Sequence, residues 1–124
     1  MIKINRMMHT GLIVTDLAKS RAFYEGLLGF TPNPNRPNFG FEGVWYDIGE
    51  NQVHLMVVPN PYEGIQRPEH GGRDVHIAFS VDDVEPVRAA LEAAGVSYTM
   101  SKSGRAALFC RDPDGNAFEF SAVK

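Results

Sequence analysis

The chain has 124 residues, of which 44% are hydrophobic and 22% are charged, as expected for one globular domain. The formal net charge of −3 gives no basic surface for nucleic acid, and no apolar run approaches the roughly 20 residues that cross a bilayer. A single cysteine, Cys110, excludes an internal disulfide, and the first residues lack the apolar core of a secretion signal. We therefore expect one domain over residues 1–124, in the cytoplasm, with Cys110 as a packed thiol.

The second half of the chain repeats the first. Residues 9–17 resemble residues 76–84, and residues 47–55 resemble residues 112–120. The two pairs are separated by nearly the same distance along the chain, which indicates two modules of one plan. We place module one at about 6–58 and module two at about 74–123.

Module one is predicted to begin with a strand over about 6–14. Thr15 or Asp16 then caps a helix that runs to about Leu28, and Gly29 suits the left-handed residue after its end. Further strands follow, one of them at 52–58.

Module two follows the same order, with a first strand at 75–81, a helix that ends at Gly95, and a closing hairpin over the Asp-Pro-Asp-Gly turn at 112–115. Each module is therefore β-α-β-β-β, and the fold class is α+β. The linker at about 59–73 is polar and rich in Pro and Gly, so we expect it to be exposed, with His70 as a solvated loop residue.

Alternation along the strands places one histidine or glutamate of each strand on the face opposite the bulky side chains. These residues are His9, His54, His76 and Glu119. We expect the bulky faces to pack against the helices and the other faces to line a shared concavity. Neutral imidazole and carboxylate suit Zn, Ni, Co, Mn or Fe(II), so the set predicts a divalent metal site. The alternative is that each histidine is an ordinary hydrogen-bonded or exposed residue.

Several motifs resemble the vicinal oxygen chelate superfamily, the group of glyoxalases, bleomycin-resistance proteins and extradiol dioxygenases. They are His9 with Val14-Thr15-Asp16-Leu17, Phe23-Tyr24, Leu28-Gly29-Phe30, His76-Ile77-Ala78-Phe79, Val81-Asp82-Asp83 and the closing Arg111 to Phe120 segment. The resemblance covers almost the whole chain. It implies that two β-α-β-β-β modules form a curved, incomplete barrel around the metal.

The resemblance also implies a homodimer in which His9 and His54 of one subunit join His76 and Glu119 of the other. His9, His76 and Glu119 match the three metal-ligand positions of the family. His54 matches the position that glyoxalase I-like members use as a fourth ligand, commonly Glu or Gln, and where extradiol dioxygenases carry an acid–base His.

Three functions follow from this resemblance. The first is a glyoxalase I-like lyase or isomerase acting on a thiol adduct of a 2-oxoaldehyde, with Glu119 as base, His54 completing the metal shell and a thiol as co-substrate. The second is an Fe(II) extradiol dioxygenase with His54 as the proton-transfer group, although Leu108-Phe109-Cys110 stands where that family usually has a Tyr. The third is a non-catalytic protein that binds a drug or metabolite.

Aromatic and basic residues near these strands are candidates for substrate contact. Phe41 and Trp45, together with Arg36 and Phe39, would form a lid or wall over the substrate, or would simply pack within their loop and strand. Arg105 precedes the closing hairpin and would hold an anionic group of the substrate, or would lie free at the surface.

Overall fold

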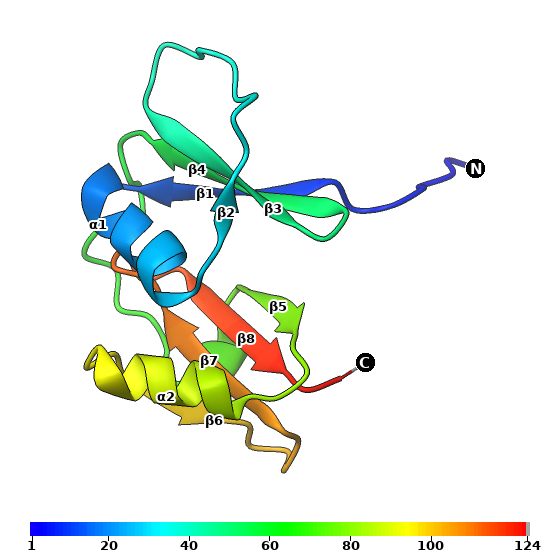
Figure 1. Ribbon diagram of the computed structural model, residues 1–124, viewed down its shortest axis with the longest axis vertical. Coiled ribbons are helices and arrows are strands. Elements are labelled where there is room, and N and C mark those ends of the chain that lie inside the picture. The colour runs from blue at the N-terminus through cyan, green and yellow to red at the C-terminus, as the bar shows by residue number, and fades with distance from the viewer. Residues whose placement is uncertain (124) are drawn as a thin grey trace.

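The computed structural model describes residues 1–123 and contains two four-stranded sheets, one from each module (Figure 1). The elements of module one are β1 (His9–Val14), α1 (Leu17–Arg21), η1 (Ala22–Leu27), β2 (Thr31–Pro32), β3 (Gly43–Ile48) and β4 (Asn51–Val57). Those that follow are η2 (Gly71–Arg73), β5 (His76–Ser80), α2 (Glu85–Ala93), β6 (Tyr98–Met100), β7 (Ala107–Arg111) and β8 (Ala117–Ser121).

The two sheets have the same topology, which confirms the predicted duplication. Their strand orders are β1-β4-β3-β2 and β5-β8-β7-β6, and neither sheet closes on itself. In each sheet the first strand pairs in parallel with the last, and the remaining pairs are antiparallel. The β-α-β-β-β fold class predicted from the sequence is therefore confirmed.

The first helix begins and ends near the predicted residues. The Asp16 carboxylate accepts a hydrogen bond from the backbone N–H of Lys19 at 3.1 Å, as a helix N-cap does. The second half of the helix, η1, is wound as a π-helix, and the N–H of Leu28 donates to the carbonyl of Phe23 at 3.0 Å. Gly29 then takes a φ of 74°, a conformation that glycine adopts without steric cost.

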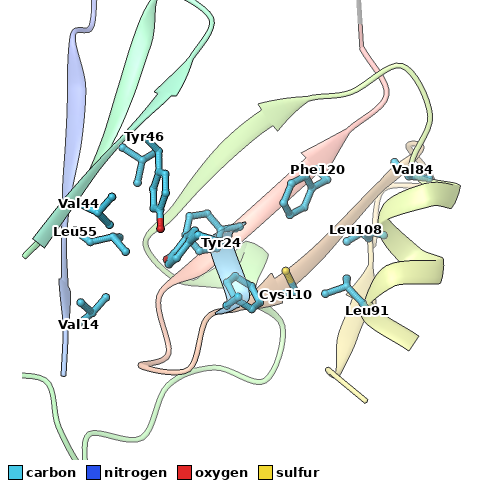
Figure 2. Packing of buried hydrophobic residues seen from close by; sticks show 13 residues of the cluster. Val14, Tyr24, Val44, Tyr46, Leu55, Val84, Leu91, Leu108, Cys110 and Phe120 are labelled. Carbon is cyan, nitrogen blue, oxygen red and sulfur yellow. The ribbon is translucent and has the colours of Figure 1, made fainter. Parts of the chain in front are cut away.

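One hydrophobic core joins the two modules. Figure 2 shows Tyr24, from η1, between the side chains of the first sheet and those of the second. Its hydroxyl donates to the carboxylate of Asp112 at 2.5 Å, and both residues are buried. Cys110 is also in this core, as predicted for a packed thiol.

Each sheet turns its bulky face toward this common core. Val53 and Leu55 of β4 and Phe118 and Phe120 of β8 are all buried in it. Because side chains alternate along a strand, the residues between them point away from the core. The residues between them therefore lie on the opposite faces of the two sheets, and on β8 that second face is buried as well.

The linker is exposed over most of its length, but its end is not. Gly71 is buried against Ala117 and Phe109, and His70 is half-buried, with Nδ1 2.6 Å from the hydroxyl of Thr99. The expectation of a solvated His70 is thus wrong, because η2 folds back onto the second sheet and brings the ring against Phe109.

Crossing a bilayer would require a longer and more apolar helix than any formed by residues 1–123.

Candidate functional site

The first pair of candidate ligands lies on neighbouring strands of the first sheet. His9 is on β1 and His54 on β4, and the rings stack with centroids 4.1 Å apart and planes 12° from parallel. On the other side of His54 lies Trp45 of β3, its cross-strand partner, at 4.2 Å and 8°. His54 is therefore held between an imidazole and an indole.

This stacked environment keeps His54 neutral. Burial is the main cause that lowers its pKa to about 4, and the neighbouring His9 ring and the charge of Arg36 act in the same direction. A neutral imidazole is the form that binds a metal ion. The Nε2 atom of His54 lies 2.8 Å from the side-chain oxygen of Gln52, which orients the ring.

The second pair lies on the second sheet. His76 is on β5 and Glu119 on the adjacent β8, with His76 Nε2 3.3 Å from Glu119 Oε1. The other ring nitrogen of His76, Nδ1, lies 2.8 Å from the carbonyl of Asp74 and donates to it when protonated. This hydrogen bond leaves Nε2 free as a ligand atom, an arrangement common among metal-binding histidines.

Glu119 is a buried carboxylate, with 7% of its surface exposed. A buried carboxylate requires compensating charge or hydrogen bonds. In this chain the compensation comes from Arg105, whose Nη1 is 3.3 Å from Oε2. Arg105, a candidate for substrate contact, is thus placed beside a candidate metal ligand by the closing hairpin.

The two pairs do not meet within one chain. Among residues 1–123, no group of three or more His, Cys, Asp or Glu side chains is close enough to hold a metal ion. The two pairs stand on different sheets, on the faces opposite the common core. Each chain therefore presents two half-sites, one with two imidazoles and one with an imidazole and a carboxylate.

The donor chemistry of the half-sites fits a divalent cation. Taken together they offer three imidazoles and one carboxylate, the ligand types of zinc and non-haem iron sites. His54 has a lowered pKa, His76 has one ring nitrogen bound to a backbone carbonyl, and Glu119 is a buried carboxyl group. The assignment of these four residues as ligands stays a prediction.

A cavity of about 190 Å³ adjoins the first half-site, and Phe41 and Trp45 are among its lining residues, as are His9 and His54. The predicted wall therefore lies beside two of the candidate ligands. Sequence reasoning missed Gln52 as a partner of His54. The signal was available, because residues two apart on a strand share a face.

Comparisons with known proteins agree with this architecture. The family model of the Glyoxalase/Bleomycin resistance protein/Dioxygenase superfamily matches residues 6–120. Lactoylglutathione lyase of Haemophilus influenzae is 33% identical over 126 residues, which cover 93% of this chain and 90% of the lyase. The uncharacterized protein YaeR of Escherichia coli is 33% identical over 130 residues, covering 96% of this chain and 97% of YaeR.

A solved structure has the same fold. The E126Q mutant of the fosfomycin resistance protein FosX from Listeria monocytogenes, complexed with Mn(II) and a dihydroxypropylphosphonic acid, superposes with a TM-score of 0.73 at 22% identity. The match covers 98% of this chain and 95% of FosX. The match of the family model over nearly the full length, together with the duplicated sheets, shows that this chain belongs to the Glyoxalase/Bleomycin resistance protein/Dioxygenase superfamily.

Proposed function

We propose that this chain is a divalent-metal-dependent lyase or isomerase of the glyoxalase I type. Its substrate would be the adduct of a thiol with a 2-oxoaldehyde or a related small oxygenated molecule. The observation that carries the proposal is the pair of preformed half-sites, His9 with His54 and His76 with Glu119. A relative of nearly the same length at 33% identity is a lactoylglutathione lyase, which supports this chemistry over others.

The site requires two chains, so we propose a homodimer. His9 and His54 of one subunit would face His76 and Glu119 of its partner and together hold the cation. Two copies related by a two-fold axis would build two such sites, because each chain supplies one half to each. The separation of the two half-sites on different sheets supports this arrangement, since no group of three ligands forms among residues 1–123.

A cation held there would supply Lewis acidity to neighbouring oxygens of the substrate and so acidify the adjacent C–H bond. Glu119 is the candidate base. Its carboxylate would take the proton from the carbon that carries sulfur and return it to the neighbouring carbon, while the hydroxyl proton of the first carbon passes to the oxygen of the second, so the substrate is isomerised without net loss of atoms. Arg105 now balances the charge of Glu119, and the cation would take over that role.

The expected role of His54 differs between the two catalytic hypotheses. In the lyase it would complete the metal shell, whereas in a ring-cleaving dioxygenase it would transfer protons near neutral pH. The lowered pKa of His54, about 4, favours the ligand role because a neutral ring with this pKa does not exchange protons efficiently near pH 7. Phe109 of β7 pairs with Glu119, so the tyrosine typical of dioxygenases is absent from this part of β7.

Metal binding tests the proposal directly. Trp45 is the only tryptophan of the chain and stacks on His54, so its fluorescence should report binding of Ni(II) or Co(II) by quenching. We expect metal-dependent conversion of the methylglyoxal–glutathione adduct, and loss of quenching in His54→Ala. Tight binding of a small molecule without any response to divalent metal would instead favour the non-catalytic binding protein. Oxygen uptake with catechol and Fe(II) would favour the dioxygenase.

A further inference from the structure

Arg36 is held in an unusual setting by the loop at 33–42, which connects β2 to β3 and projects from the first sheet (Figure 1). Its Nη2 donates to the carbonyl of Phe41 at 3.0 Å. Its guanidinium carbon lies 5.2 Å from the centroid of the Phe39 ring and 5.4 Å from that of Phe41. The charged group is thus fixed by aromatic contacts rather than by an acid.

Among residues 1–123, the charge of Arg36 has no acidic partner. The Nε atom is buried and has no hydrogen-bond acceptor, and among residues 1–123 no carboxylate forms an ion pair with the guanidinium. Withdrawing a cation from water without a counter-charge costs free energy. An acceptor supplied from outside the chain would offset that cost.

Arg36 also lines the cavity of about 190 Å³ beside the first half-site, together with His9, His54 and Trp45, and no Asp or Glu lines it. Gly43 permits this position, because a Cβ atom there would lie 2.8 Å from Nη2 of Arg36 and 2.2 Å from the carbonyl of Leu55. The cavity is smaller than the roughly 300–1,000 Å³ of whole-ligand pockets, so it fits one end of a substrate.

We propose that Arg36 binds an oxyanion of the substrate, a carboxylate or a phosphate, and thereby selects anionic substrates. This inference rests on the proposed function, which places the metal donors His9 and His54 at the same cavity. The fork of N–H donors on a guanidinium matches the oxygens of either anion, and the aromatic rings keep the fork in place. The reacting oxygens would then lie toward the half-site and the anionic end toward Arg36.

Fluorescence of Trp45 tests this without relying on catalysis. Inorganic phosphate and acetate are titrated separately, which distinguishes the two anions, against wild type, Arg36→Met, Arg36→Lys and the matched control Arg88→Met. Arg88 lies on α2 and is bound to Glu92 and Tyr98, away from this cavity. We expect Arg36→Met to weaken binding about 10- to 100-fold and Arg88→Met to leave it unchanged.

Arg36→Lys should give an intermediate affinity, because it keeps the charge and loses the fork. It also decides the matter if Arg36→Met fails to fold by circular dichroism. In the lyase assay, Arg36→Met should raise KM for the glutathione adduct, which carries carboxylates, and not for the neutral mercaptoethanol adduct.

Two results would overturn the inference. One is the lack of a saturable response of wild type to either anion, and the other is equal affinity in wild type and a folded Arg36 variant. A wild-type protein that binds the anion but shows no metal-dependent lyase activity would instead contradict the proposed function and leave this inference standing.

Discussion

A mixing experiment with two inactive variants tests whether each metal site is shared between subunits. His9→Ala damages the first half-site and Glu119→Ala damages the second, so each homodimer should have only background activity. In a mixed dimer one site carries both substitutions, and the other combines the intact His9 of one subunit with the intact Glu119 of its partner. That second site should bind metal and catalyse the reaction.

The expected magnitude follows from the geometry. Random assortment of equal amounts makes about half of the dimers mixed, and each mixed dimer has one intact site of two, so activity should recover to about a quarter of wild type. The variants are unfolded and refolded together, and thioester formation is measured alongside bound metal. Differently tagged subunits allow the mixed dimer to be isolated, and it should show about half of the wild-type activity.

A matched mixture provides the control. In a mixed dimer of His9→Ala and His54→Ala subunits, each subunit carries a damaged first half-site. Both metal sites are therefore damaged, and activity should not recover. If the first mixture also stays at background although mixed dimers are present, the site is not shared between subunits. Recovery in both mixtures would contradict the assignment of His9 and His54 to one half-site.

Two further predictions concern the core between the sheets. Tyr24→Phe removes the hydroxyl that donates to the buried Asp112 carboxylate and should lower the free energy of unfolding by about 1.5–3 kcal/mol, measured by urea denaturation. Tyr98→Phe, whose hydroxyl bonds exposed Arg88 and Glu92, is the control, and an equal loss in both would contradict the reasoning. Burial raises the pKa of Cys110 from 9.0 to about 12, so its thiol should react with Ellman's reagent only as fast as the protein unfolds. The unfolded thiol ionises at a lower pH than the folded one, which stabilises the unfolded state. The free energy of unfolding should therefore fall as pH rises from about 9 toward 12, and Cys110→Ala should show a smaller fall over this range.

The sequence predicted the modules because their signals are local. A helix cap at Asp16, a glycine after the helix and the turn at 112–115 each depend on residues within a few positions of one another. The alternation of side chains on β4 and β8 likewise needs no knowledge of the neighbouring strand. These expectations are confirmed by the two sheets and their buried faces.

Several features of the site depend on packing that no local pattern contains. The ion pair of Arg105 with Glu119 joins residues on different parts of the closing hairpin, and the position of Arg36 depends on an irregular loop and on the missing side chain of Gly43. The burial of His70 arises because η2 packs against β7 and β8. Such contacts are set by the shape of the assembled sheets.

The sequence by itself determined which residues share a face and that the chain is duplicated, since both follow from strand periodicity and repetition. Only the tertiary structure decided that His9 lies with His54 and His76 with Glu119, in two separate half-sites. The reason is that the bulky faces of both sheets are buried in one core, so each pair stands on the opposite face of its own sheet.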